Sequence, residues 1–393
     1  MPEQNFIYLD HAASTPVAPE VVTAMLPYFT ETYGNPSGLH KQARASNRAL
    51  TMARRTVAKI LNCQPKEVIF TSGGSESDNM AVRGVAWALA QAGKGKHLIT
   101  SPVEHAAVQK TIQQLCDQHG FSQTLIPVDE VGMVNPADIK AAIQPDTTLI
   151  SIMAANNEVG TLQPIVEIGA IAQQHGIIFH SDTVQAIGTI PLDTQALNID
   201  MLGMSAHKFY GPKGVGVLYM KDGTPFTSHS TGGSHEEGRR PGTENVASIV
   251  GLATALELAY ENRKTYTQQL TSLRDQLIKG VLDNIPGAIL TGHPTQRLPQ
   301  HASFVFKDCD ASALLMHLDN QGIGGASGSA CDTGMPEPSG VLLAMGVEPQ
   351  LALGALRLTL GRSTTAADID YVLKILPSVV EKVRGLQQVH QAV

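Results

Sequence analysis

Short apolar runs rich in β-branched residues recur along the first two thirds of this chain, at 68–70, 97–100, 149–153, 176–180 and 214–219. Stretches with helical spacing separate several of them, as at 164–175, where apolar side chains recur on one helical face. This alternation predicts an α/β fold with a mostly parallel sheet covered by helices on both faces. Such sheets bind ligands outside the carboxyl ends of their strands, so functional loops are expected there.

The pattern changes from about residue 257. A long helix is predicted over 255–285, followed by an α+β segment around 303–306 and a loop rich in Gly and Ser at 322–340. Another helix is expected near the C-terminus. The change predicts a domain boundary near residue 262.

Composition narrows the class of protein. The chain has 393 residues, of which 42% are hydrophobic and 16% charged, and this excludes a wholly disordered chain. Its net charge of −7 argues against broad nucleic-acid or anionic-membrane binding. The four cysteines form neither a disulfide framework nor a metal-binding spacing, so no metal is expected. No export signal or membrane-spanning run is evident, and a cytoplasmic location is expected.

Lys208 is the first candidate for chemistry. It ends the sequence Ser-Ala-His-Lys after a moderately apolar segment, and a glycine-rich stretch follows. A lysine at a strand end can form a Schiff base if its amine is desolvated. Alone, a lysine is more often a solvated surface residue.

Asp182 is the second candidate. It follows the strand-like run at 176–180, 26 residues before Lys208. A carboxylate in this place can keep the pyridine nitrogen of pyridoxal phosphate protonated, and Gln185 can reach the ring hydroxyl. Asp182 is also suited to cap a helix, and both roles can hold together.

Two further motifs would complete a cofactor site. Glycines and hydroxyls at 70–79, including Gly74 and Ser75, lie between a predicted strand and a predicted helix. They suit a phosphate cradle, or alone an ordinary helix-capping turn. His105 follows the strand at 97–100 and can stack on a planar cofactor ring, although a single histidine is more often solvated or buried in a core.

Cys331 and Arg357 would act on the substrate. Cys331 lies among small, flexible residues, which suits a travelling nucleophile if a nearby cation or base lowers its pKa; alone it is as readily an inert thiol, and the other three cysteines are interpreted as structural. Arg357 stands alone in an apolar run, so its guanidinium needs an anionic partner. That partner is either a substrate carboxylate or an internal acid.

Taken together, these motifs resemble the NifS/IscS-like cysteine desulfurases, a class V aminotransferase group among the fold-type-I pyridoxal-phosphate enzymes. The similar segments run in one order from 8–16 to 360–362 and include 33–36, 72–79, 156–160, 205–208, 240–245 and 327–331. The resemblance implies a large cofactor-binding domain, 15–261, built on a mostly parallel seven-stranded sheet between helices. It implies a smaller α+β domain, 1–14 and 262–393, that carries the cysteine loop.

The resemblance also implies an activity and a set of roles. L-Cysteine would become L-alanine, with the sulfur held as a persulfide on Cys331. The catalytic residues would be Cys331, Lys208, which carries the cofactor, and His105. The cofactor would also contact Asp182, Gln185, Gly74, Ser75, Ser205, His207, Asn157 and, from the partner subunit of a homodimer, Thr243. Asn35, Asn157 and Arg357 would bind the substrate.

The partners implied are sulfur-acceptor proteins, such as an iron–sulfur scaffold, with tRNA or cofactor thiolation as a further outlet. No direct nucleic-acid or membrane contact is expected. The long loop around Cys331 is similar to that of the group with a mobile catalytic loop.

Three positions depart from the family pattern. Asp332 adds a negative charge beside Cys331, which should raise the pKa of the thiol slightly. Ser234 stands where the family has glycine and Glu237 where it has arginine, which alters the charge near the intersubunit phosphate site. The alternatives are a selenocysteine lyase, a cysteine-sulfinate-type lyase, a class V aminotransferase and a non-catalytic scaffold. Cys331 favours desulfuration, and the presence of Lys208 and Asp182 weighs against a scaffold.

Overall fold

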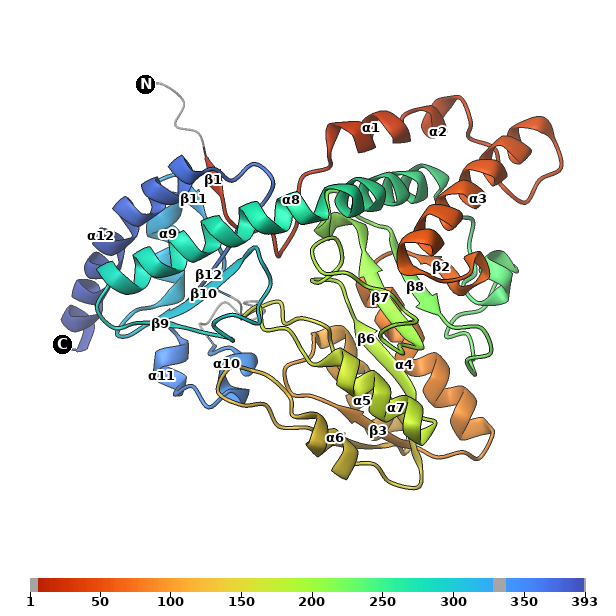
Figure 1. The fold of residues 1–393 in the computed structure, drawn as a ribbon, viewed down its shortest axis with the longest axis horizontal. Helices are drawn as coiled ribbons and strands as arrows, with labels where there is room; N and C mark the ends of the chain where they lie inside the picture. The colour runs from red at the N-terminus through yellow and green to blue at the C-terminus, as the bar shows by residue number, and fades with distance from the viewer. Residues whose placement is uncertain (1–5, 328–336, 392–393) are drawn as a thin grey trace.

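The computed structural model describes residues 6–327 and 337–391 (Figure 1). A seven-stranded sheet organises the larger part, in the order β2-β8-β7-β6-β5-β3-β4. Its strands are β2 (Val68–Thr71), β3 (His97–Thr100), β4 (Ser122–Leu125), β5 (Thr147–Ser151), β6 (Ile178–Asp182), β7 (Met201–Ser205) and β8 (Gly216–Met220). Only β8 runs against its neighbours, so the predicted mostly parallel α/β sheet is confirmed.

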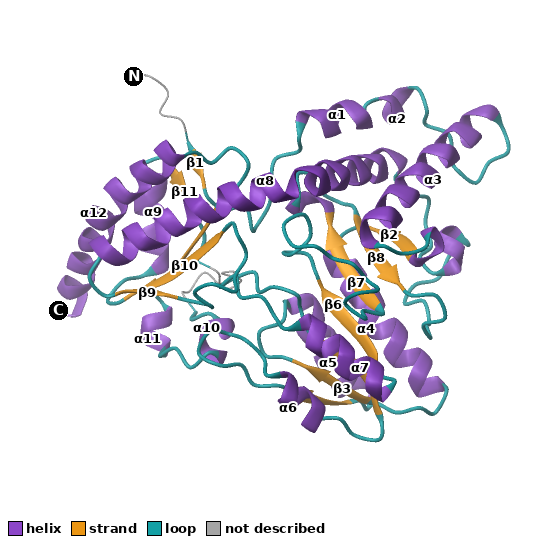
Figure 2. Cartoon of the chain, viewed as in Figure 1, coloured by secondary structure: helices purple, strands orange, loops and turns teal. Residues whose placement is uncertain are grey.

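Helices cover both faces of this sheet, as Figure 2 shows. Alternate strand residues point to opposite faces. Ile69, Leu98 and Met201 pack against helices α4 and α5. Phe70, Ile99 and Leu202 pack against α3, α7 and the first part of α8. These helices are α3 (Lys41–Leu61), α4 (Gly74–Gln91), α5 (Ala106–His119), α7 (Ile165–His175) and α8 (Val246–Asn284).

A three-stranded antiparallel sheet forms the second part, in the order β12-β10-β9. Its strands are β9 (Ala288–Leu290), β10 (His301–Phe306) and β12 (Ala355–Thr359), and the short strand β1 (Ile7–Tyr8) pairs with β11 (Ile323–Gly324) nearby. Its core is shared with α9 (Ala311–Asp319), α12 (Ala366–Gln391) and the second part of α8.

The remaining elements are short. They are the helices α1 (Pro19–Met25), α2 (Pro27–Thr30), α6 (Pro136–Ala141), α10 (Gly340–Ala344) and α11 (Pro349–Ala352), and the 3₁₀ turns η1 (Pro65–Glu67), η2 (Ala206–Lys208) and η3 (His235–Gly238). No helix in the described ranges is both long and apolar enough to span a bilayer.

Helix α8 joins the two parts and begins nine residues before the predicted start at 255. The side chain of Asn245 accepts a hydrogen bond from the backbone N–H of Ser248 at 3.2 Å and so caps the helix there. Ala259 belongs to the core of the large sheet, whereas Leu270 belongs to the core of the small one. This change of packing supports the proposed boundary near residue 262, which lies inside one continuous helix.

Replacing Leu277 with alanine tests the small core. Leu277 of α8 is fully buried there. Leu277→Ala should lower the free energy of unfolding by about 2–5 kcal/mol, because the lost packing leaves a cavity. Urea denaturation followed by circular dichroism measures it. Leu282→Ala on the same helix is the control, since Leu282 is 42% exposed. Equal losses in the two variants would contradict this packing.

Candidate active site

A cavity of about 420 Å³ opens at the carboxyl ends of the large sheet's strands. The residues predicted for the cofactor and substrate that line it are Gly74, Ser75, His105, Asn157, Asp182, Gln185, Ser205, His207, Lys208 and Arg357. All but Arg357 follow or end strands of the large sheet, and Arg357 comes from β12 of the small one. The two parts of the chain therefore meet at this cavity.

Lys208 lies in η2, directly after β7. Its amine donates hydrogen bonds to the carbonyl oxygens of Ala12 at 2.5 Å and Ala13 at 2.9 Å. Burial lowers the pKa of this amine to about 8, with a smaller lowering contribution from the charge of Arg357. A lowered pKa leaves more of the amine neutral near neutral pH, which is the form that attacks a carbonyl carbon.

Asp182 ends β6, and its Oδ1 accepts the backbone N–H of Val184 at 2.8 Å. A turn follows rather than a helix, so the alternative interpretation of Asp182 as a helix cap is wrong. Burial, together with the charge of Asp78, raises the pKa of this carboxyl to about 7. A positively charged N–H beside it would restore the ionised form, which is what a protonated pyridine offers.

A second layer of ionisable groups lies beneath Asp182, and the sequence motifs did not indicate it. Nε2 of His180 is 3.5 Å from Oδ1 of Asp78, and both side chains are fully buried. Burial raises the pKa of Asp78 to about 8 and lowers that of His180 to about 4. Near neutral pH the imidazole of His180 is therefore neutral and the carboxyl of Asp78 is mostly protonated. The only sequence signal was the short spacing of His180 and Asp182.

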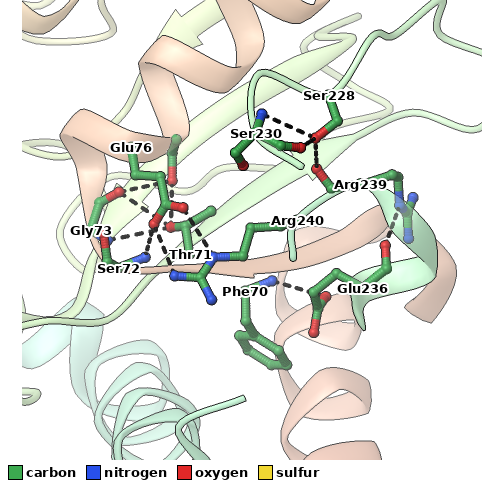
Figure 3. Close-up of polar contacts among 11 residues, drawn as sticks. Phe70, Thr71, Ser72, Gly73, Glu76, Ser228, Ser230, Glu236, Arg239 and Arg240 are labelled. Carbon is green, nitrogen blue, oxygen red and sulfur yellow. Dashed lines mark hydrogen bonds and ion pairs between the residues drawn. The ribbon is translucent and has the colours of Figure 1, made fainter. Parts of the chain in front are cut away.

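The loop before α4, predicted to be an anion cradle, is shaped by its glycines and by the polar contacts drawn in Figure 3. Gly73 has φ +155° and ψ −178°, a conformation essentially reserved for glycine, and α4 begins at the next residue. A Cβ on Gly74 would lie 2.6 Å from a methyl carbon of Val184. The first N–H groups of α4 have no partner within the helix, so they are available to an anion in the cavity.

Charged partners fix this cradle from outside. The Glu76 carboxylate accepts the backbone N–H of Ser72 and pairs with Arg240 at 3.0 Å (Figure 3). Glu236 pairs with Arg54 at 2.7 Å and accepts the N–H of Phe70 at 3.1 Å.

The two departures at Ser234 and Glu237 lie in or beside η3, which Glu236 anchors to β2. Glu237 has φ +58° and pairs with Arg239 at 3.3 Å. Its carboxylate is exposed, so its charge faces solvent instead of the cavity.

Arg357 is held by two contacts that the sequence did not predict. Its Nη2 donates to Oδ1 of Asp10 at 2.9 Å, and its Nη1 donates to the backbone oxygen of Asn157 at 2.8 Å. Its Nε is buried without a hydrogen-bond partner among the described residues. The sequence left an internal acid and a substrate carboxylate as alternative anionic partners of Arg357. Asp10 is such an internal acid, and the unpaired Nε is a donor that remains for a substrate carboxylate.

Residues 10–15, which we name the strap, cross from the small sheet to Lys208. The N–H of Ala12 donates to Oγ1 of Thr359 at 2.9 Å, and Gln185 donates to the carbonyl of Ala12 at 3.0 Å. The Oγ1 of Thr15 donates to the carbonyl of His207 at 2.9 Å. The strap therefore fixes the distance between the guanidinium of Arg357 and the amine of Lys208.

His105 and His207 both line the cavity. Nδ1 of His105 accepts the N–H of Ala107 at 3.1 Å, so the ring caps α5. Nδ1 of His207 lies 3.3 Å from the hydroxyl of Ser14. Burial and the charge of Lys208 lower the pKa of His207 to about 4, which makes it a neutral hydrogen-bonding group.

Two predicted residues do not line this cavity. Asn35 is exposed between α2 and α3, where its side chain accepts the N–H of Ser37 at 3.0 Å. Thr243 is exposed just before α8. A role for Thr243 therefore requires a second copy of the chain.

Cys331 and Asp332 lie outside the described residues. The described residues on each side of them contact the Arg357 end of the site. Ala326 exchanges backbone hydrogen bonds with Arg357 at 2.6 and 3.0 Å, and Ser339 donates to Glu158 at 2.5 Å.

The three described cysteines are free thiols, and burial raises the pKa of each. The pKa is about 12 for Cys63 and about 11 for Cys309, with a smaller rise at Cys116. Each is therefore a poor thiolate nucleophile.

Comparison with known proteins places the chain in a family. Residues 7–372 match the family model described as aminotransferase class-V. The chain is 48% identical to a cysteine desulfurase IscS of Methanosarcina thermophila over 98% of this chain and 94% of that protein. It is 47% identical to a cysteine desulfurase IscS of Clostridium botulinum over 97% and 96% of the two chains.

Solved structures agree. A NifS-like protein superposes with a TM-score of 0.89 at 36% identity and covers 96% of this chain and 100% of its own. A structure titled SspA in complex with cysteine gives 0.79 at 33% identity, with 90% and 98% of the chains covered. This chain therefore belongs to the class-V aminotransferase family, in its NifS/IscS-like cysteine desulfurase group.

Proposed function

We propose that this protein is a pyridoxal-phosphate-dependent cysteine desulfurase that converts L-cysteine to L-alanine and passes the sulfur, through Cys331, to acceptor proteins such as an iron–sulfur scaffold. The observation that carries the proposal is the cavity in which Lys208, Asp182, the cradle before α4 and Arg357 converge. A neighbouring structure titled as a complex with cysteine supports the choice of substrate class.

The residues of the cavity fit the cofactor group by group. The Lys208 amine would attach it, Asp182 would pair with its pyridine nitrogen, and the N–H groups of Gly74 and Ser75 would hold its phosphate. Ser205 and His207 would add hydrogen bonds to the phosphate, Gln185 would reach the ring hydroxyl, and His105 and Asn157 would lie by the ring. When bound, the cofactor supplies an electron-withdrawing ring that eases removal of a proton from the substrate Cα.

The chain's own groups then orient the substrate and move its protons. Arg357 would bind the carboxylate, through donors that Asp10 and Asn157 leave unused. Lys208 would take the proton from Cα, for which a pKa of about 8 suits a base near neutral pH. The strap keeps these two groups at a fixed separation, so the carboxylate and the Cα proton are presented together.

Cys331 would accept the sulfur. Its thiolate would form a bond to the substrate sulfur as the bond between that sulfur and Cβ breaks. The electron pair of the broken bond stays with the carbon skeleton, which is protonated to alanine. The neighbouring parts of the chain support this role. Ser327, the nearest described residue before Cys331, directly follows Ala326, which is hydrogen-bonded to Arg357. Glu337, the nearest described residue after it, lies two positions before Ser339, which is hydrogen-bonded to Glu158.

A homodimer is the proposed assembly. Large apolar side chains are exposed on α1, α2 and α3, among them Leu26 and Phe29, each 58% exposed. Figure 1 shows α1 and α2 along one edge of the molecule. A cluster of this kind suits a protein–protein contact. In such a dimer Thr243 would complete the phosphate site of the other subunit.

The Cys331→Ala variant tests the activity. It should retain the yellow colour of the bound cofactor but lose alanine formation from L-cysteine, because the sulfur then has no acceptor thiol. The control Lys208→Ala should lose both the attached cofactor and the activity. Absorbance and amino-acid analysis measure the two properties. Normal alanine formation by Cys331→Ala would contradict the role of Cys331.

The Arg357→Lys variant tests carboxylate recognition. Lysine keeps the charge but cannot bind Asp10, Asn157 and a carboxylate in one fork. The KM for L-cysteine should rise about tenfold to a hundredfold, equivalent to roughly 1.5–3 kcal/mol for a charged hydrogen bond. Steady-state kinetics measure it, with Arg384→Lys on α12 as the control. An unchanged KM would refute the assignment.

The pH dependence of cofactor attachment tests the amine. The pKa of Lys208 is lowered to about 8, so the neutral, reactive amine accumulates as the pH rises through 8. The rate at which the cofactor-free protein gains the cofactor absorbance should therefore rise between pH 7 and 9 and level off above. Stopped-flow absorbance measures the rate. A profile that keeps rising to pH 10.5, the ordinary lysine value, would exclude the lowered pKa.

A further inference from the structure

A second, smaller cavity of about 50 Å³ lies at the junction of the two parts of the chain. The strap contributes His11, the segment after η2 contributes Tyr210, and α8 contributes Tyr266. Gln300 and Arg362, which flank β10 and β12, close it from the small sheet. We name this space the junction cavity. The side chains of Lys208 and Gln185 separate it from the larger cavity, because they line both.

The junction cavity is lined by residues whose buried polar atoms lack hydrogen-bond partners among the described residues. These atoms are Oε1 of Gln300, Nε of Arg362 and the ring nitrogens of His11, although the backbone of Tyr8 lies near enough to the His11 ring to raise its pKa. His11 is only 6% exposed, and its ring packs so closely on Gly361 that a Cβ there would lie 2.1 Å from the ring. Leaving a buried polar group unpaired costs about 1–3 kcal/mol, so these residues call for a hydrogen-bonding occupant of the space, either water or a ligand.

The charge of the lining is one-sided. The guanidinium carbon of Arg362 lies 4.4 Å from the ring centre of Tyr210 and 4.9 Å from that of Tyr266. Within the described ranges Arg362 makes no ion pair, and no carboxylate lines the cavity. A half-buried cation without an acid partner calls for an anion, since the aromatic faces offset only part of its lost hydration.

The neutral groups add no opposing charge, and Gln300 can present a donor. Burial lowers the pKa of His11 to about 4, against a smaller raising effect of a backbone hydrogen bond at Tyr8, so its ring is neutral near pH 7. The side-chain amide of Gln300 can turn its NH₂ group to the cavity, because the two ends of an amide are interchangeable in shape.

We propose that the junction cavity binds a compact monovalent anion of halide size, held by Arg362 with a hydrogen bond from Gln300. The space admits a few atoms, since one water needs about 10–15 Å³ of the same measure, and it excludes a phosphorylated ligand. Apolar walls from Ile187, Leu270 and Leu360 suit a weakly hydrated ion. Binding of the anion there does not depend on the proposed catalysis.

Bromide locates the site directly. Crystals of the cofactor-loaded protein grown in sodium bromide should show an anomalous peak within hydrogen-bond distance of Arg362 and of Gln300. The peak should be absent from Arg362→Gln crystals grown in the same salt. Density for water alone would overturn the proposal, as would a peak of equal height in Arg362→Gln.

Thermal denaturation tests binding in solution. At constant ionic strength, replacing sodium gluconate, whose anion is too large for the cavity, with sodium bromide should raise the Tm along a saturable curve. Arg362→Gln should abolish this rise. Gln300→Met, which keeps the cation, should weaken bromide binding several-fold and serves if Arg362→Gln does not fold.

Arg263→Gln is the matched control. Arg263 stacks on Tyr260 of α8 at 4.9 Å but does not line the junction cavity. This variant should keep the bromide response of the unmodified protein. An equal loss of response in Arg263→Gln and Arg362→Gln would show a general salt effect and refute the site.

Discussion

The hydrogen bonds from the Lys208 amine to the carbonyls of Ala12 and Ala13 are the contact on which the site depends. They bring the strap, which is anchored to β12 through Thr359, against the end of β7. The same strap presents Asp10 to Arg357. One short segment therefore positions both the amine that is proposed to carry the cofactor and the guanidinium proposed to carry the substrate.

Burial sets the protonation states of the ionisable groups around the cavity. It lowers the pKa values of Lys208 and His207 and raises those of Asp182 and Asp78, in each case as the largest cause. The groups around the cavity are thus shifted toward their neutral forms. A cationic ring at Asp182 and an anion at the α4 cradle would each restore a favourable charge pairing, which is why this donor set fits a phosphorylated pyridine.

Much of the fold followed from pattern alone. The apolar runs at 68–70, 97–100 and 176–180 became β2, β3 and β6, because a strand buried on both faces must be continuously apolar. The start of α8 was missed, since residues 246–254 are almost all apolar or small and so show no helical alternation with polar residues, and Asn245 supplies the cap. The strap and the layer of Asp78 and His180 were missed for another reason. Their partners are far away in sequence, and no spacing within one segment reveals such a contact.

Local chemistry along the chain made Lys208, Asp182, the glycines before α4 and Arg357 candidates, although each has a common structural use, and only their combination pointed to one site. Their convergence came from the topology, since parallel strands bring their carboxyl ends to one edge however distant they are in sequence. Folding also supplied the pKa shifts and the partner of Arg357, because burial and the Asp10 contact exist only when residues 347 positions apart in the sequence are brought together. Neither the pKa shifts nor the partner of Arg357 can be read from the composition of the chain.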